Sequence, residues 1–348
     1  MNNTSIQNSL LGTAVGDALG LPYEGLTPAR AIRLLGYPDR FRFFFGRGMV
    51  SDDTEHATIV AQCLIASAGD DAVFERELAR RLKRWFLALP AGIGLATLRA
   101  CLNLWLGSGP HRSGVFSAGN GPSMRAAIIG VAVDSADQVL RLNHLSTRIT
   151  HTDPIAEQGA AAVALAAWAA SRGQCDDTAS FFRLLRERLV GEHAEAFLQT
   201  IDQVEKSLAA NEQTEQFAAT LCGNRGVTGY TLHTVPVCLH AWLSHRGRPA
   251  EGLRCLIRCG GDTDSTAAVA GGIFGAENDI SDELVKGIRD YPCSTGWIRR
   301  LSAQLTQVSE TGIPQRPLQP FLPLQLLRNV VFASIVLAHG FRRLFPPY

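Results

Sequence analysis

The chain has 348 residues, of which 46% are apolar and 19% are charged, and its formal net charge is +1. This length and apolar content allow one large domain or two ordinary ones around a sizeable core, and they exclude a wholly disordered chain. The balanced charge gives no reason to expect nucleic acid as a partner, because phosphate binding normally needs a basic excess or patch.

The cysteines and the first residues indicate where the protein resides. The eight cysteines include no Cys-x-x-Cys pair, and the Cys255/Cys259 pair lacks the neighbouring Cys or His of a zinc site. We interpret the cysteines as buried free thiols. Residues 1–7 are polar and lack the basic and apolar regions of a signal peptide, so a reducing cytoplasmic location is expected.

Helical patterning dominates, and alternating strand-like runs are hard to find. A helix is expected over 53–68, entered through Ser51-Asp52-Asp53, and the Ala-rich segment 155–170 favours another. The sequence therefore predicts an all-α fold without a repeat of fixed period. The remaining predicted helices are 74–87, 125–133, 135–146, 178–189, 193–208, 229–244, 249–258, 264–274 and 280–290.

Glycines gather in four segments, 12–25, 107–121, 223–229 and 260–275. Each segment adjoins polar residues at a predicted helix edge. Because glycine lets the backbone approach a ligand closely, these segments are predicted to lie near a binding site.

The composition changes after residue 310. Four prolines within 311–323 predict an extended linker that follows a helical domain over 1–310, and residues 324–348 predict an apolar C-terminal helix. Its apolar run 330–338 is too short to span a bilayer. Two alternatives remain open: a membrane-surface helix that ends in Arg342-Arg343, and a helix that docks on the main domain or on a second copy of the chain.

Two acidic clusters each place two carboxylates at the start of an apolar helix. They are Ser51-Asp52-Asp53-Thr54 and Asp262-Thr263-Asp264-Ser265, the second preceded by Gly260-Gly261. Either cluster alone is explained by helix capping. Crowded carboxylates repel one another, however, and a hard divalent cation relieves this repulsion with oxygen ligands. Convergence of the clusters would create a site for two such ions.

Five segments in order resemble the successive motifs of the ADP-ribosylglycohydrolase family, of the dinitrogenase reductase-activating glycohydrolase type. They are 12–20, 51–54, 119–125, 150–151 and 261–265. Five ordered motifs are far more specific than any one of them. The linker and tail after Thr311 lie outside the resemblance.

The resemblance implies an orthogonal multi-helix bundle with a central cleft for two Mg²⁺ ions, or Mn²⁺ in some members. It implies that Glu24, Asp53 and Asp264 are catalytic. The implied metal ligands are Ser51, Asp52, Asp53, Asp262, Asp264 and Ser265. The residues implied to contact ADP-ribose are Ser117, Gly119, Asn120, Gly121, Met124, His151 and Tyr230, the last by packing on the adenine.

Several residues also have simpler interpretations. Asp17 is expected to be a structural hydrogen-bonding residue rather than a ligand. His151 is also explained as an ordinary half-buried histidine, and Met124 and Tyr230 as packing residues. Arg125 either binds phosphate or pairs with a helix carboxylate.

The chain departs from the family at one position. Arginine-specific bacterial relatives often carry an Asp just before an Ile-Gly pair, whereas here Ala91-Gly92 precedes Ile93-Gly94. The missing carboxylate puts an arginine linkage in doubt and leaves serine-linked or other ADP-ribosyl substrates open.

These residues lead to a functional hypothesis. The chain is expected to be a metal-dependent hydrolase that removes ADP-ribose from protein side chains through an oxocarbenium-like transition state. Glu24 would handle a proton, and the N–H groups of residues 119–121 would bind the pyrophosphate. The alternative is a protein with the same fold and little turnover, which binds ADP-ribose or neutralises an ADP-ribosyltransferase.

Overall fold

The structure, a computed structural model, describes residues 4–174, 177–191 and 194–346. The first three residues of the polar start, Cys175, residue 193 at the start of one predicted helix and the last two residues of the tail lie outside the described residues.

Within these ranges the regular elements are helices, and extended segments pair only through isolated β-bridges. The predicted all-α fold is therefore confirmed. In chain order the elements are α1 (Ser5–Gly20), η1 (Leu21–Tyr23), α2 (Pro28–Leu35), α3 (Asp52–Ser67), α4 (Asp71–Phe86), α5 (Leu95–Trp105), α6 (Pro110–Ser113), η2 (Ser123–Arg125), α7 (Ala127–Ala132), α8 (Ala136–Arg148), α9 (Pro154–Ser171), α10 (Thr178–Arg188), α11 (Ala194–Ala209), α12 (Thr214–Cys222), α13 (Thr231–Ser244), α14 (Pro249–Arg258), α15 (Thr263–Glu277), α16 (Asp282–Gly287), α17 (Thr295–Thr311) and α18 (Leu322–Arg342).

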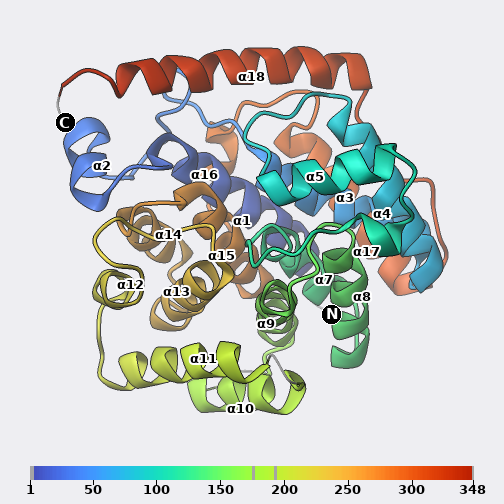
Figure 1. Cartoon of the computed structure of the whole chain (residues 1–348), viewed down its shortest axis with the longest axis horizontal. Helices are drawn as coiled ribbons and strands as arrows, with labels where there is room; N and C mark the ends of the chain where they lie inside the picture. The colour runs from blue at the N-terminus through green and yellow to red at the C-terminus, as the bar shows by residue number, and fades with distance from the viewer. Residues whose placement is uncertain (1–3, 175–176, 192–193, 347–348) are drawn as a thin grey trace.

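The helices predicted from periodicity are present to within a few residues at each end, as α3, α9 and α14 illustrate. The sequence analysis missed α1, α2, α5, α12 and α17. Of these, α1 matters most, because it is buried along almost its whole length and lies at the centre of the bundle (Figure 1). A helix that is buried all round has no polar face, so periodicity does not reveal it.

Helices α1 and α15 pack backbone against backbone. A Cβ atom at Gly12 would lie 2.1 Å from the carbonyl oxygen of Gly271, and one at Gly16 would lie 2.0 Å from that of Ala267. On the facing helix, a Cβ at Gly275 would lie 2.0 Å from the carbonyl oxygen of Asn8. For Gly12 and Gly16 of the 12–25 segment, the expected close approach to a ligand is therefore wrong: these glycines allow close approach of another helix.

This helix pair is surrounded by the other elements. The Ala-rich helix α9 is buried over most of its length, with α7, α8 and α13 around it, because small side chains let neighbouring helices approach. In Figure 1, α10 and α11 lie at one edge of the molecule, and α18 lies along the opposite edge. The cores of α1, α3, α9 and α15 belong to one hydrophobic cluster.

The turn before α15 joins three distant segments. Gly260 and Gly261 have φ values of +69° and +82°, which side-chain-bearing residues rarely adopt. The Gly261 N–H donates to the Leu26 carbonyl (2.9 Å), and the Asp262 N–H donates to the Val227 carbonyl (2.7 Å). These hydrogen bonds hold a tight turn that brings the segment after η1 beside the start of α15.

We predict that Gly16→Ala destabilises the protein by about 2 kcal/mol or more. The added Cβ would clash with the carbonyl oxygen of Ala267, and a backbone atom cannot move aside as the end of a flexible side chain can. The matched control is Gly340→Ala in α18, where no atom lies within 4 Å of the added Cβ. Thermal unfolding should show a lower melting temperature for Gly16→Ala and no decrease for Gly340→Ala. Equal melting temperatures would contradict the close helix contact.

Candidate active site

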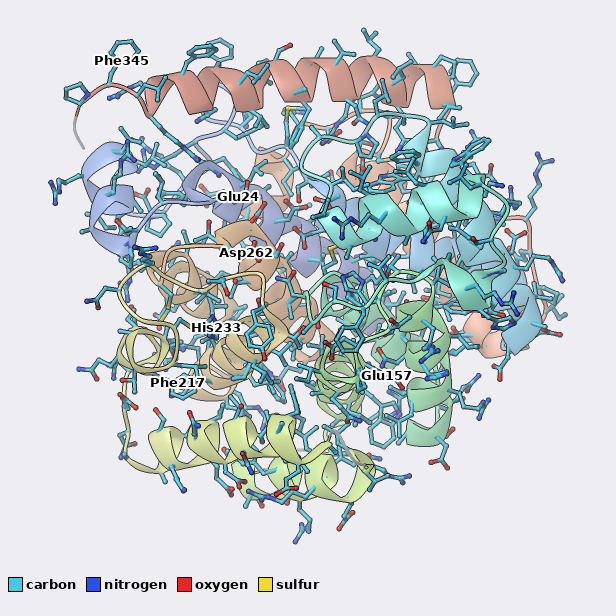
Figure 2. The ribbon with its side chains drawn as sticks, in the orientation of Figure 1. Glu24, Glu157, Phe217, His233, Asp262 and Phe345 are labelled. Carbon is cyan, nitrogen blue, oxygen red and sulfur yellow. The ribbon has the colours of Figure 1, made fainter. Side chains whose placement is uncertain are left out.

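A cleft of about 390 Å³ lies where the predicted motifs converge. Its walls come from the segment after η1, the start of α3, the 91–97 segment, the 117–124 loop, the end of α8 and the start of α15. The lining residues are Glu24, Asp52, Gly92, Gly94, Leu95, Ala96, Thr97, Ser117, Gly119, Asn120, Gly121, Met124, His151, Gly229, Asp262, Asp264 and Ser265. Figure 2 shows Glu24 and Asp262 on neighbouring segments in the middle of the molecule.

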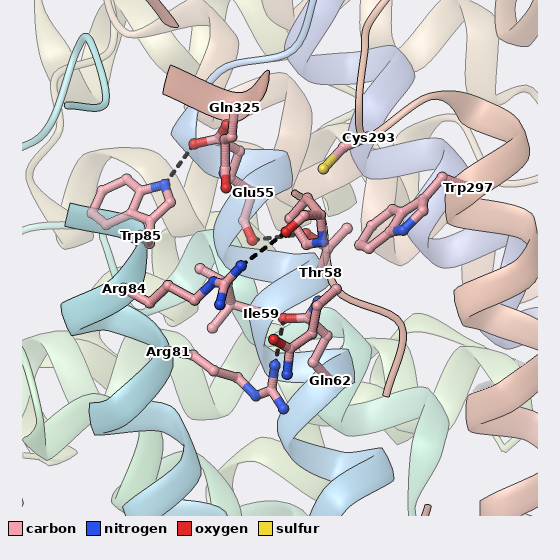
Figure 3. Close-up of a pocket in the computed structure, with 12 residues that line it drawn as sticks. Glu55, Thr58, Ile59, Gln62, Arg81, Arg84, Trp85, Cys293, Trp297 and Gln325 are labelled. Atoms are coloured by element: carbon pink, nitrogen blue, oxygen red, sulfur yellow. Dashed lines mark hydrogen bonds between the residues drawn. The ribbon is translucent and has the colours of Figure 1, made fainter. Parts of the chain in front are cut away.

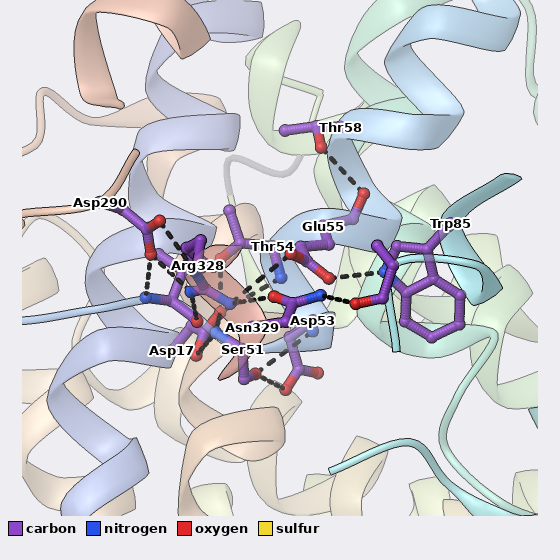
Figure 4. A network of polar contacts seen from close by, with 12 residues as sticks. Asp17, Ser51, Asp53, Thr54, Glu55, Thr58, Trp85, Asp290, Arg328 and Asn329 are labelled. Atoms are coloured by element: carbon purple, nitrogen blue, oxygen red, sulfur yellow. Dashed lines mark hydrogen bonds and ion pairs between the residues drawn. The ribbon is translucent and has the colours of Figure 1, made fainter. Parts of the chain in front are cut away.

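Asp17 on α1 organises the first acidic cluster without lining the cleft. Its carboxylate accepts the N–H groups of Ser51 (2.8 Å) and Thr54 (3.2 Å) and the Thr54 hydroxyl (2.5 Å). Figure 4 shows this carboxylate beneath the start of α3. Burial raises the pKa of Asp17 to about 6, against the effect of these hydrogen bonds. Asp17 is thus a structural residue, as expected.

The two clusters touch one another. The Ser265 hydroxyl donates to Oδ2 of Asp53 over 3.2 Å, although 212 positions separate the two residues. Oδ2 of Asp53 also accepts the Ser51 hydroxyl (3.0 Å). Asp53 and Ser51 lie behind the cleft wall, almost fully buried, whereas Asp52, Asp262 and Asp264 line the cleft.

The carboxylates of the clusters destabilise one another's charge. Burial first, and then Glu24, Asp262 and Asp53, raise the pKa of Asp264 well above its ordinary value. Burial, followed by Asp52, Asp17 and Asp262, does the same for Asp53. The charge of Arg343 interacts with those of Glu24 and Asp264. Burial and the neighbouring carboxylates nevertheless outweigh it, so the protein disfavours the charged forms of Asp53 and Asp264.

The donor atoms suit hard divalent cations. Oδ1 of Asp53 and Oδ1 of Asp264 are buried, and neither has a hydrogen-bond partner. An unpartnered buried carboxylate oxygen is costly unless a cation or proton approaches it. Among the residues that the structure describes, no three His, Cys, Asp or Glu side chains form a ready-made metal geometry. The fit therefore rests on the donor chemistry, which consists of carboxylate and hydroxyl oxygens.

Asn120 connects the 117–124 loop to the second cluster. Its side-chain amide donates to Oδ2 of Asp262 (2.8 Å) and to the Thr234 hydroxyl (3.0 Å). Its backbone N–H donates to the Gly229 carbonyl, and the Gly119 N–H donates to the Ser117 hydroxyl. Two of the three N–H groups that were expected to bind pyrophosphate are therefore already used, which corrects that expectation.

His151 supports the same loop from below. A Cβ atom at Gly121 would lie 2.9 Å from Cε1 of His151, and one at Gly119 would lie 3.2 Å from its Nε2. Glycine at both positions lets the loop backbone rest on the imidazole ring. Burial and the nearby Arg125 lower the pKa of His151 to about 3, so the ring is neutral. Its Nδ1 lies 2.9 Å from the Thr150 hydroxyl.

Arg125 has neither of the roles considered for it. The side chain is fully buried and donates to the Ser146 hydroxyl and carbonyl and to the Thr150 hydroxyl. Tyr230 does not line the cleft. Its ring is 39% exposed and packs edge-on against His233, while its backbone pairs with Gly119 at the cleft rim.

The sequence analysis also missed part of the cleft wall. Leu95, Ala96 and Thr97 at the start of α5 line the cleft. Nothing in the sequence indicated them, because α5 itself was not predicted. Gly92, the position where a carboxylate is missing, also lines the cleft, and a Cβ atom there would lie 3.8 Å from Oδ1 of Asp52. A side chain at residue 92 would therefore begin beside the first acidic cluster.

Comparison with known proteins agrees with this geometry. The sequence profile of the family described as ADP-ribosylglycohydrolase matches residues 3–314. The chain belongs to this family, whose members are glycohydrolases. It is 33% identical to an uncharacterized protein of Archaeoglobus fulgidus, over 82% of this chain and 91% of that protein.

Two further relatives carry more informative names. The chain is 24% identical to ADP-ribosylhydrolase ARH3 of Gallus gallus, over 77% of this chain and 83% of that protein. A solved structure described as an ADP-ribosylglycohydrolase-related protein complex superposes with a TM-score of 0.56 at 24% identity, covering 88% of this chain and 98% of that one. This similarity supports the fold.

We predict that Asn120→Asp, tested in EDTA, destabilises the protein by about 2 kcal/mol, because it replaces a donor to Asp262 with a like charge. The control is Asn211→Asp, which makes the same charge change at an exposed turn residue. Chemical denaturation measures both variants. Equal stability would show that the Asn120–Asp262 contact does not hold the loop.

Proposed function

We propose that the chain is a divalent-cation-dependent hydrolase that removes ADP-ribose from a protein side chain. The observation that carries the proposal is the contact between the two acidic clusters behind one cleft, with buried, unpartnered oxygens on Asp53 and Asp264. The names of the ARH3 relatives support ADP-ribosylated protein as the substrate class.

The residues at the cleft have different proposed roles. Ser51, Asp52, Asp53, Asp262, Asp264 and Ser265 would hold two Mg²⁺ or Mn²⁺ ions. When bound, these ions would supply Lewis-acid polarisation and orient the sugar hydroxyls and the attacking water. Asp17 fixes the start of α3, and Asn120 fixes Asp262, so the ligand segments are preorganised.

Glu24 is assigned to proton transfer because it opens on the cleft and lies outside both clusters. The charge of Asp262 helps to raise the pKa of Glu24, which supports a role for Glu24 near the proposed cation site. The loop over His151 would hold the remainder of the ADP-ribose. There the Gly121 backbone and the Ser117 side chain line the wall. Cleavage would pass through an oxocarbenium-like transition state stabilised by the surrounding carboxylates.

Gly92 bears on which type of side chain carries the ADP-ribose in the substrate. It leaves open space beside Asp52 where arginine-specific relatives often carry a carboxylate. We therefore favour an oxygen-linked substrate over an arginine-linked one.

The same glycine supports the second candidate, an ADP-ribose-binding or transferase-neutralising protein with little turnover. Binding without release of ADP-ribose from any linkage would favour that candidate. Rapid turnover of a serine-linked substrate would exclude it.

The test measures ADP-ribose release from serine- and arginine-linked proteins with Mg²⁺, with Mn²⁺ and with EDTA. We expect release from the serine-linked protein, abolished by EDTA and reduced on the order of 100-fold or more by Asp264→Asn. The control Asp202→Asn removes an exposed carboxylate on α11 and should be as active as the unaltered protein. Full activity in EDTA would overturn the proposal.

A further inference from the structure

Helix α18 lies outside the family match, which ends at residue 314, and it presents two different faces. One face packs on the body of the protein and the other is open. In Figure 1 the helix runs along an outer edge of the molecule, with most of its circumference uncovered. By length and composition the whole helix could cross a membrane, which corrects the expectation drawn from its shorter apolar run 330–338, and only 17% of its most apolar stretch is buried.

The inward face is fixed by polar contacts as well as by the buried Phe332. Arg328 forms an ion pair with Asp290 and donates to the Val50 carbonyl, next to the first ligand cluster. Figure 4 shows this guanidinium between Asp290 and Glu55. Asn329 donates to the Ala88 carbonyl (2.8 Å).

The start of α18 closes a second polar site. Gln325 covers a small buried cavity over Glu55, together with Trp85 and Cys293 (Figure 3). Near the other end, Arg343 donates to the Pro22 carbonyl (3.0 Å). A helix that crossed a bilayer would lose all these contacts and would bury Arg328 in hydrocarbon. These contacts therefore argue that α18 stays docked on the body.

The outward face is apolar from end to end. Its exposed large apolar residues are Leu326, Leu327, Val330, Val331, Val336, Leu337, Phe341, Leu344 and Phe345, and the exposed polar residues of the helix are Ser334 and the terminal Arg342. Leu337 and Phe341 remain 63% and 64% exposed. An apolar stripe of this length on one soluble helix is unusual and marks an interaction surface.

A tight turn extends the apolar surface beyond the helix. Phe44 and Arg47 pair across this turn, and at its tip Phe45 has φ +47° and is 95% exposed. A groove of about 410 Å³ joins Phe44 to Leu327 and Val331 on α18. Phe43 fixes the turn to the helix, because its carbonyl lies 2.9 Å from Nε2 of His339 and its ring packs on Phe332.

Exposed arginines border this surface. Residues 311–348 contain four arginines and no Asp or Glu. Arg342 at the end of α18, Arg47 on the turn and Arg289 beside the groove are exposed at its border. An apolar face bordered by exposed arginines is complementary to an anionic lipid surface. A second copy of the same face would bring no carboxylate from this segment to meet those arginines.

We propose that the outward face of α18 and the Phe44–Arg47 turn bind the surface of an anionic lipid bilayer. The helix lies in the plane of the interface and keeps its inward face on the protein. Since that inward face holds Val50 and Pro22, which precede the ligand residues of α3 and Glu24, the membrane-bound surface is rigidly connected to the cleft.

The test is co-sedimentation of the full chain with phosphatidylcholine vesicles, with and without about one third phosphatidylglycerol. We expect binding to the anionic vesicles that weakens as salt rises, because the arginine contribution is screened. Leu337→Glu and Phe341→Glu should each lower the apparent partition coefficient at least about tenfold, and Phe45→Glu should lower it by a smaller factor.

The matched control is Val190→Glu, which makes the same change at a residue that is 70% exposed just after α10, a helix at the opposite edge of the molecule in Figure 1. This variant should bind as the unaltered chain does. Unchanged melting temperatures establish that the variants are folded. Three results would overturn the proposal: no binding to anionic vesicles, vesicle association that resists alkaline carbonate, or a vesicle-independent dimer that Leu337→Glu dissociates.

Discussion

The contact between the glycine faces of α1 and α15 is the constraint on which the rest of the structure depends. Carbonyl oxygens of each helix occupy the space where Cβ atoms would lie on the other, so the two axes approach as closely as helices can. Asp17 on α1 then reaches the start of α3, while Asp262 and Asp264 stand at the start of α15. Two clusters that are far apart in sequence consequently share one cleft.

The same contact creates an electrostatic problem that defines the site. Close packing brings Asp53 and the α15 carboxylates together away from water, where each raises the pKa of the others. The protein supplies hydroxyls from Ser51 and Ser265, and the charge of Arg343 acts on Asp264, but the pKa values of Asp53 and Asp264 remain raised. A fold stabilised by other means can maintain such a cluster, and bound divalent cations would relieve the repulsion in the proposed site. In contrast, Arg328 meets its carboxylate partner Asp290 directly, and there the pair is structural.

Much of this arrangement could be predicted from the sequence. Local residue types and spacing predict the helical class, the acidic clusters and the glycines at 260 and 261. These features can be recognised in a single sequence because they depend only on residues that lie close together along the chain. The function of the glycines in α1 could not be predicted, because glycine serves equally for ligand approach and helix contact, and only the partner distinguishes them. Arg125 posed a similar difficulty: its partners Ser146 and Thr150 are neutral, so no charge pattern indicated them. The wall at the start of α5 was missed since nothing in its composition marks it.

The central claim is that carboxylates from α3 and α15 form one cation site. The most direct measurement is titration of the protein with Mn²⁺, followed by electron paramagnetic resonance, for the unaltered chain and for Asp53→Asn and Asp264→Asn. If the site is shared, either substitution weakens Mn²⁺ binding throughout the titration, and the magnetic coupling between neighbouring ions disappears in both variants. If both variants bind Mn²⁺ as tightly as the unaltered chain does, the two clusters are helix caps, and the account of the site is wrong.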